Sequence, residues 1–244
     1  MTRDVFHAFD LRGLQTAAKF DSLVAGEGLT SISACQSSSS CAGGADEAKT
    51  TISYNADGSV ASISSGNGSG TLTATTAMTY DALGNLLTVD GPLSGTADTT
   101  RLRYNAARER IGIISPDPDG GGSLKHRAVR TTINGEGLPI KVERGTVDSQ
   151  SDTDWTAFSA LEAVETAYDS NARQVTQKLT SGGTTYALAQ TSYDALGRVE
   201  CVAQRMNPSE FGSLPSSACS LDTQGSYGAD RIVKTVYDAA GQVS

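Results

Sequence analysis

Few side chains in this chain could carry out chemistry on a substrate. Its 244 residues include two histidines, His7 and His126, and four cysteines. A nucleophilic site needs a serine or cysteine beside a base that takes its proton. Neither histidine lies in a recognisable nucleophile motif, and the chain has no Gly-x-Ser-x-Gly elbow. We therefore predict that both histidines lie at the surface and that the protein is not an enzyme.

The pattern closest to a metal site is Pro-Asp-Pro-Asp-Gly-Gly-Gly-Ser, residues 116–123, where Asp117 and Asp119 alternate as in a calcium loop. An EF-hand loop needs a further ligand at its fifth position and a glutamate at its twelfth. Gly121 and Ala128 occupy those positions here. The sequence thus predicts an exposed turn, and we expect no metal or other cofactor.

The four cysteines form two pairs along the chain. Cys35 and Cys41 flank Gln-Ser-Ser-Ser-Ser, and Cys201 and Cys219 flank a loop that contains glycine and proline. A zinc site would need closer spacing of its ligands. Two local disulfides are the favoured interpretation, and they would imply an oxidising compartment. Three pairings of four cysteines are open, and four free thiols in the cytosol are the alternative.

The composition excludes two classes of partner. The formal net charge is −8, and lysine and arginine are dispersed rather than gathered in the basic stripe that nucleic acid requires. No apolar run approaches the ~18 residues of a membrane span. The first ten residues lack the apolar core of a signal peptide, so the chain is either not exported alone or lacks its true N-terminus.

The elements that position these residues follow from an internal repeat. Six of the eight tyrosines begin a Tyr-Asp or Tyr-Asn pair. The strongest copies, YDALGNL, YDALGRV and YDAAGQV, share the residues Tyr80, Asp81, Gly84, Tyr193, Asp194, Gly197, Tyr237, Asp238 and Gly241. The weaker units are led by Phe9, Tyr54, Tyr104, Ile133 and Tyr168, the last followed by Asp169. Most steps between units are close to 25 residues, which is typical of repeat proteins.

Each copy of the motif has the chemistry of a hairpin turn. An aspartate at the first turn position and a glycine at the fourth fit a type I turn closed by a left-handed glycine. The flanking residues are rich in Thr, Val and Ile, which suit strands. Tyr168, Tyr193 and Tyr237 are expected in one row, each ring covering the next unit with its hydroxyl at the water edge.

Three segments interrupt the repeat. Two insertions, about 30–50 and 202–230, contain the cysteines, and Cys201 is expected to mark the point where the chain leaves the sheet. The spacing of Trp155 and Phe158 predicts one short helix near 154–160, with Thr153 or Asp154 as N-cap, and then a strand into Tyr168. A helix that continues to residue 166 is the alternative.

The repeated motif resembles the YD repeat of the RHS (rearrangement hotspot) family, whose pattern is close to YDxxGRL. The resemblance covers residues 9–244 as a single array of eight units. It implies an all-β fold of repeated β-hairpins in a curved, spiralling antiparallel sheet that forms a hollow shell. In bacterial toxin systems such a shell encloses a C-terminal toxin, and in animal teneurins a related shell supports adhesion at the cell surface.

The resemblance predicts a non-enzymatic wall segment of an RHS-type shell in a secreted or surface-associated bacterial protein. Eight units are too few to close a large shell, so the expected partners are further RHS repeats of the same or a split polypeptide, and a toxin or other cargo. The alternative is a surface module that binds a glycan or a protein through the cysteine-bracketed loops. Protruding loops at 36–40 and 202–218 would favour binding, and loops folded over the sheet would favour the shell.

Overall fold

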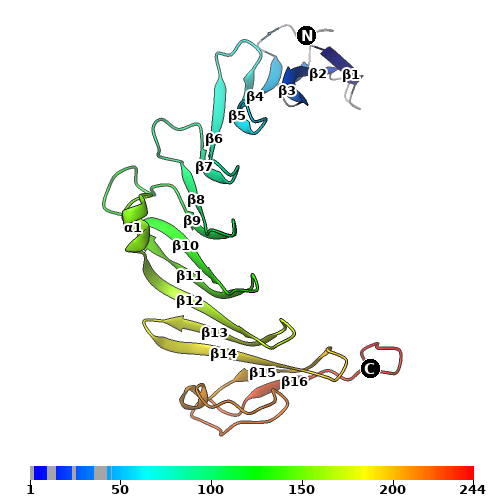
Figure 1. The fold of residues 1–244 in the computed structure, drawn as a ribbon, viewed down its shortest axis with the longest axis vertical. Helices are drawn as coiled ribbons and strands as arrows, with labels where there is room; N and C mark the ends of the chain where they lie inside the picture. Colours follow the sequence, from blue (N-terminus) through cyan, green and yellow to red (C-terminus); the bar gives the residue numbers. More distant parts are fainter. Residues whose placement is uncertain (1–2, 10–14, 24–25, 36–42, 45) are drawn as a thin grey trace. The chain divides into compact units, whose positions relative to one another are not determined.

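The fold consists almost entirely of β-hairpins that follow one another along the chain (Figure 1). The computed structural model describes residues 3–9, 15–23, 26–35, 43–44 and 46–244, and within these the side chains from residue 28 onward. Residues 1–103 and 115–124 form one compact unit, and residues 104–114 and 125–244 form a second. Within each unit every strand is antiparallel to its chain neighbours, which confirms the all-β fold of repeated hairpins.

The described part of the chain contains sixteen strands and two short helices. The earlier strands are β1 (Arg3–Phe9), β2 (Gln15–Leu23), β3 (Gly26–Cys35), β4 (Glu47–Tyr54), β5 (Val60–Asn67), β6 (Thr73–Tyr80), β7 (Leu86–Asp90) and β8 (Thr100–Tyr104). The later ones are β9 (Arg110–Ile114), β10 (His126–Ile133), β11 (Pro139–Val147), β12 (Ser159–Tyr168), β13 (Gln174–Ser181), β14 (Thr184–Tyr193), β15 (Val199–Arg205) and β16 (Arg231–Lys234). The helices are α1 (Asp152–Thr156) and the 3₁₀ turn η1 (Pro208–Glu210).

Seven hairpin turns share one hydrogen-bond pattern. In the turn that begins at Asp194, the Asp194 N–H donates to the Arg198 carbonyl and the Gly197 N–H donates to the Asp194 carbonyl, both at 2.9 Å. The same two bonds close the turns that begin at Asn55, Asp81, Asn105, Asn134, Asp169 and Asp238. The Oδ1 atom of Asp194 also accepts from the N–H groups of Leu196 and Arg198. The aspartate therefore stabilises the turn through its side chain as well as its backbone.

The fourth turn position always has a positive φ angle. It is glycine in five of the seven turns, including Gly84 at +81° and Gly197 at +80°, but Arg108 at +66° and Ala172 at +60° occupy it in the other two. A side chain with a Cβ atom is strained in this region, whereas glycine enters it without that cost. The turns at Arg108 and Ala172 are therefore the strained members of the series.

We expect Ala172→Gly to stabilise the protein by about 1 kcal/mol, because relief of the left-handed strain outweighs the added freedom of the unfolded chain. Gly84→Ala should destabilise it by a similar amount, since a Cβ there would contact nothing within 4 Å and only the backbone effect remains. Urea unfolding of both variants measures the two shifts. Equal signs for the two substitutions would contradict this account.

The helix α1 begins earlier and ends earlier than predicted. Ser151 is its N-cap and accepts a hydrogen bond from the Asp154 N–H at 3.0 Å, so Thr153 and Asp154 lie inside the helix. The helix does not continue toward residue 166, and the strand predicted to run into Tyr168 is confirmed as β12. Phe158, just after the helix, turns onto the sheet instead.

Two small hydrophobic clusters lie where segments outside the hairpins pack on strands of the second unit. One consists of Ile114, Ala128, Val147 and Phe158, with Trp155 against it. The other consists of Cys201, Ala203 and Ala218, with Cys219 and Ile232 against it. His126, predicted at the surface, is only 9% exposed at the start of β10, because it belongs to a strand covered by the first of these segments.

The insertions are shorter than expected. β15 continues beyond Cys201 to Arg205, and β16 begins at Arg231, so the second insertion spans residues 206–230. Cys201 thus lies inside a strand and does not mark its end. Its neighbours in Cys-Val-Ala-Gln-Arg alternate between buried and outward positions, but alanine and arginine hide this pattern in the sequence. Near the first insertion, β3 extends to Cys35 and β4 begins at Glu47.

Candidate functional site: the tyrosine ladder and the clasped insertion

Five of the six tyrosines that lead the motif join their hairpin to an earlier one. The Tyr193 hydroxyl donates to the Gln174 carbonyl at 2.8 Å, and the Tyr237 hydroxyl donates to the Val199 carbonyl at 3.0 Å. Tyr54, Tyr80 and Tyr168 donate in the same way to the carbonyls of Leu29, Val60 and Pro139. We call these five bonds the tyrosine ladder. The rings were expected to cover the next unit with hydroxyls in water, but they reach the preceding unit and bond its backbone.

The two arginines that follow the turn motif add a second link between hairpins. The Arg173 guanidinium lies 4.4 Å from the centre of the Tyr193 ring, and the Arg198 guanidinium lies 4.2 Å from that of Tyr237. Each arginine also pairs with the aspartate of its own turn at 2.7 Å, Arg173 with Asp169 and Arg198 with Asp194. These contacts make an Asp–Arg–Tyr relay from one turn to the next, with a cation–π contact in each.

The relay was not anticipated from the sequence. The signal available was the arginine that directly follows the glycine in YDALGR, which recurs after Ala172 as Arg173. In the other five turns of the series this position holds Ser59, Asn85, Glu109, Leu138 and Gln242. The relay therefore belongs to the two turns of β12–β13 and β14–β15.

The relay also lowers the pKa of its aspartates. The Arg173 side chain, and then its backbone N–H, hold the pKa of Asp169 below its usual value. For Asp194 the largest effect is the hydrogen bond from the Arg198 backbone N–H, which lowers the pKa; burial raises it, and the Arg198 side chain lowers it further. In both turns the charged carboxylate is the form that the folded state prefers.

We expect Asp194→Asn to reveal this preference as a pH dependence. Because the folded pKa is lowered, the stabilisation by Asp194 is complete above the unfolded pKa near ~4 and is lost as the pH falls through the folded pKa. The variant should be less stable than the parent at pH 7, and the difference should shrink at pH 3. Urea unfolding at both pH values measures it. An equal difference at both would show that the carboxylate charge plays no part.

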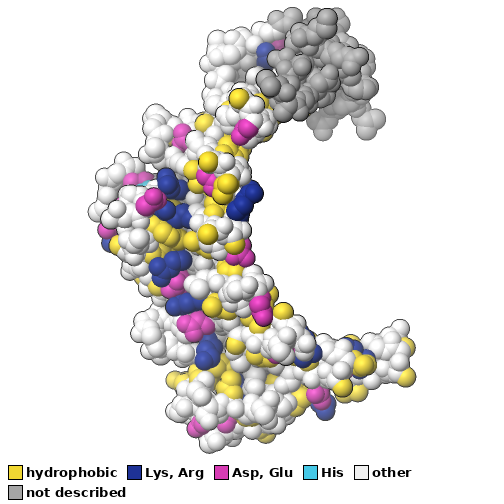
Figure 2. All heavy atoms as spheres, in the orientation of Figure 1, with side chains coloured by type: hydrophobic (Ala, Val, Ile, Leu, Met, Phe, Trp, Pro, Cys, Tyr) yellow, Lys and Arg dark blue, Asp and Glu magenta, His cyan; other side chains and the backbone are white. Residues whose placement is uncertain are grey.

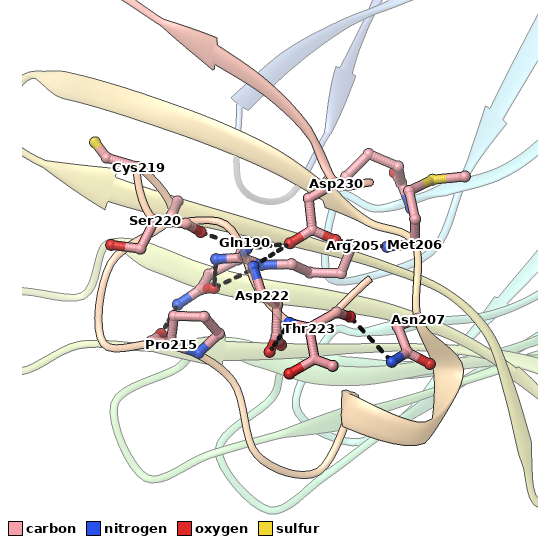
Figure 3. Close-up of polar contacts among 12 residues, drawn as sticks. Gln190, Arg205, Met206, Asn207, Pro215, Cys219, Ser220, Asp222, Thr223 and Asp230 are labelled. Atoms are coloured by element: carbon pink, nitrogen blue, oxygen red, sulfur yellow. Dashed lines mark hydrogen bonds and ion pairs between the residues drawn. The ribbon is translucent and has the colours of Figure 1, made fainter. Parts of the chain in front are cut away.

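The second insertion is held to the sheet by a buried polar cluster around Arg205 (Figure 3). The Arg205 side chain is 1% exposed and the Asp230 side chain 3% exposed, and the two pair at 2.5 Å. The Nε and Nη2 atoms of Arg205 donate to the Gln190 Oε1 atom. The Nη1 atom also donates to the Ser220 carbonyl, and the Nη2 atom to the Ser217 carbonyl. One arginine thus fastens residues 217–230 to β14 and β15.

Asp230 fixes both ends of the insertion. Its Oδ1 atom accepts from the Met206 N–H at 2.9 Å, and its Oδ2 atom accepts from the Asp222 N–H at 3.0 Å. Burial raises the pKa of Asp230, but the Met206 N–H, the Arg205 guanidinium and the Asp222 N–H outweigh it, so the pKa is lowered overall. The carboxylate is therefore charged and fully paired.

Further contacts lay the insertion against the strands. The Gln190 Nε2 atom donates to the Pro215 carbonyl at 2.8 Å, and the Ala218 N–H donates to the Ser192 hydroxyl at 2.7 Å. Cys201 and Cys219 form a disulfide with their Cα atoms 5.3 Å apart. We call this set of contacts the clasp. Cys35 is buried at the end of β3, while Cys41 and residues 36–40 lie outside the described residues.

Charged side chains elsewhere on the second unit pair across strands. Glu143, 7% exposed, bonds Arg130 at 2.8 Å and Lys141 at 3.2 Å, and Lys141 reaches Glu165 at 3.8 Å. The Arg130 hydrogen bond, aided by Lys141, lowers the pKa of Glu143 against the effect of burial. Figure 2 shows basic and acidic side chains interspersed on the face in view. Because these opposite charges pair across the strands, they create no field of one sign.

The acidic loop at residues 116–123 uses its carboxylates internally. Asp117 accepts from the N–H groups of Asp119 and Gly121, and Asp119 accepts from the Leu124 N–H. Across the described residues, no cluster of three or more His, Cys, Asp or Glu side chains could hold a metal ion. None of the helices in the described residues has the length and apolarity of a membrane span.

The predicted motif residues do not converge on one site. Tyr193, Asp194 and Gly197 meet in one turn, and the matching residues of the other copies meet in their own turns. Cys201 and Cys219 are brought together, but in the clasp, next to Arg205 and Asp230, which the sequence did not single out. The arrangement therefore fixes backbone segments relative to one another, within each turn and within the clasp.

No family model matches the chain, and no curated protein matches its sequence. Solved structures do resemble it. A crystal structure of TcdB2-TccC3-Cdc42 matches 99% of the chain with a TM-score of 0.51 at 15% sequence identity. A crystal structure of TcdB2-TccC3 also matches 99% of it, with a TM-score of 0.51 at 14% identity. The chain spans only 12% and 13% of those two chains. At this level of identity, what the chain shares with part of the TcdB2-TccC3 chains is its fold.

Proposed function

We propose that this chain is a non-enzymatic segment of an RHS-type β-shell and forms part of the wall of a chamber for a toxin or other cargo. The observation that carries the proposal is the tyrosine ladder, which repeats one bond between successive hairpins, as from Tyr193 to Gln174. A strip in which the same bond recurs between units can extend by adding further units. The fold similarity to TcdB2-TccC3 supports the same conclusion.

The proposed partners are further RHS repeats, on the same or a split polypeptide, and the enclosed cargo. In the strand order of the described residues, β16 has β15 as its single neighbour. An exposed strand edge offers unpaired N–H and C=O groups to another strand. A secreted or surface location is part of the proposal, because the Cys201–Cys219 disulfide suits an oxidising compartment.

The clasp bears on the alternative of a binding module with protruding loops. Residues 206–230 are tied to β15 by the Cys201–Cys219 disulfide and lie against β14 and β15, held by Arg205 and by the Ala218–Ser192 bond. A loop that covers the sheet favours the wall proposal over a module that binds a partner through protruding loops.

Three measurements test the wall proposal. The coding sequence on both sides of this chain should encode more YD repeats, and the isolated 244 residues should self-associate through their strand edges in light scattering. In the longer polypeptide, the cargo enclosed by the shell should resist protease. Replacing Tyr80, Tyr193 and Tyr237 together by alanine should open the sheet and expose that cargo to protease. A monodisperse monomer of the isolated chain, or flanks without repeats, would count against the proposal.

A further inference from the structure

A row of side chains crosses the second unit and ends in the clasp. Its members lie directly opposite one another on β11 to β15 and therefore share one face of the sheet: Lys141, Glu165, Lys178, Leu188 and Arg205. The clasp covers this face at β14 and β15, where Leu188 is buried. Phe158 covers the same face at Val147 of β11. Between these two covers, the face is open over β12 and β13.

Two adjacent hollows lie in this open stretch. Their volumes are about 330 and 310 Å³, near the lower end of the range for ligand sites, and Lys141 and Glu165 line both of them. Ala163, 5% exposed, lines the first hollow, and Ala167 lines the second. These short side chains of β12 leave room between the longer ones beside them. We call the two hollows together the β12 groove.

Two charged groups of the β12 groove are left largely unused by the fold. Lys178 lines the second hollow and forms no ion pair with the described residues. Glu165 has one ion pair, at 3.8 Å to Lys141, which already bonds Glu143 at 3.2 Å. Although Glu165 and Lys178 are partners in the strand register, no ion pair joins them. The groove thus offers one carboxylate and one ammonium group to a ligand.

The remaining charges of the groove are already paired. Glu143 is bonded by Arg130 at 2.8 Å, and Glu162 by Arg144 at 3.0 Å. A ligand with charges of one sign would therefore gain one ion pair and meet repulsion at the other free group. The ligand that complements the groove carries one positive and one negative group close together.

An extended peptide can supply this pattern. Residues two apart lie on the same side of an extended chain, ~7 Å from each other. That spacing suits two hollows that share a wall. Thr176 in one hollow and Thr185 in the other have hydroxyls with no hydrogen bond to the described residues, so they can bond the backbone of such a peptide.

We propose that the β12 groove docks an extended segment of a partner protein in which a lysine or arginine stands two residues from an aspartate or glutamate. The basic residue of the partner pairs with Glu165, and the acidic residue pairs with Lys178. The docking site does not depend on the wall function, because none of its residues belongs to the tyrosine ladder.

A binding experiment on the whole chain tests the proposal. The probes are four heptapeptides with Lys-Thr-Glu, Lys-Thr-Lys, Glu-Thr-Glu or Thr-Thr-Thr between flanking Thr-Val pairs, titrated to about 10 mM. The Lys-Thr-Glu peptide should bind most tightly. Lys178→Ala and Glu165→Ala should each weaken it by about fivefold, the upper end for a partly exposed ion pair. Arg127→Ala is the matched control and should leave the affinity unchanged, because Arg127 is exposed on the other face of β10, between the buried His126 and Ala128.

Lys178→Glu adds a test that a loss of folding cannot imitate. This variant should reverse the preference and bind the Lys-Thr-Lys peptide more tightly than the Lys-Thr-Glu peptide. An unchanged preference would overturn the proposal. The same holds for a parent protein that binds none of the peptides or does not prefer Lys-Thr-Glu, and for an equal loss of affinity in Arg127→Ala and Lys178→Ala. Flanking sequences without repeats would count against the wall and leave this result unaffected.

Discussion

Arg205→Ala is expected to lower the free energy of unfolding by about 3–5 kcal/mol, the usual cost of leaving one partner of a buried ion pair alone. Asp230, 3% exposed, would be left buried without the guanidinium, and the Ser217 and Ser220 carbonyls would lose their donor. The insertion should then detach from β14 and β15. Urea unfolding gives the energy, and hydrogen exchange of residues 206–230 shows where it is lost.

A matched arginine elsewhere provides the control. Arg144 pairs with Glu162 at 3.0 Å, but the two side chains are 73% and 44% exposed. Exposed pairs contribute about 0–1 kcal/mol, so Arg144→Ala should have little effect. If Arg205→Ala costs no more than Arg144→Ala, the clasp does not stabilise the fold in the way described.

Removal of the Cys201–Cys219 disulfide is expected to cost about 3 kcal/mol, because it closes a loop across 18 residues whose freedom the unfolded chain would regain. Cys201→Ala/Cys219→Ala makes the change without reductant. Cys201 is 0% exposed against Ala203 and Ala218, so alanine keeps most of the packing. Thermal unfolding and hydrogen exchange of residues 206–230 measure the result.

Reductant supplies the internal control for this experiment. Dithiothreitol should increase exchange in residues 206–230 of the parent protein and should have no further effect there on the double variant. The two clasp variants touch the same loop, so their combined cost should be smaller than the sum of the separate costs. A fully additive result would mean that the disulfide and Arg205 hold different parts of the chain.

The hairpin turns could be predicted because their chemistry is local. Asp194 and Gly197 lie three residues apart, and one turn satisfies both the carboxylate and the positive φ angle. The strand that ends at Tyr168 was predictable for the same reason. The N-cap was missed by two or three residues, because Ser151, Thr153 and Asp154 are all acceptable caps and the local sequence does not choose among them.

Contacts between distant residues could not be predicted in this way. Nothing in the sequence joins Arg205 to Asp230, 25 residues away, and an arginine in a strand is usually exposed. The burial of His126 likewise depends on a separate segment that folds over its strand. The direction of the tyrosine ladder was missed because the motif fixes where Tyr193 stands, but not which neighbour its hydroxyl reaches.

That direction has a consequence for synthesis. Each rung of the ladder runs from a tyrosine to a carbonyl made earlier, by 19 residues for Tyr193 and by 38 for Tyr237. When a hairpin leaves the ribosome, the carbonyl that accepts its tyrosine hydroxyl has therefore already been made. Formation of this bond does not depend on residues made later. Chains are made from the N-terminus and fold unit by unit as they emerge. The sheet can therefore extend hairpin by hairpin during synthesis, with each new hairpin bonded to one that was made before it.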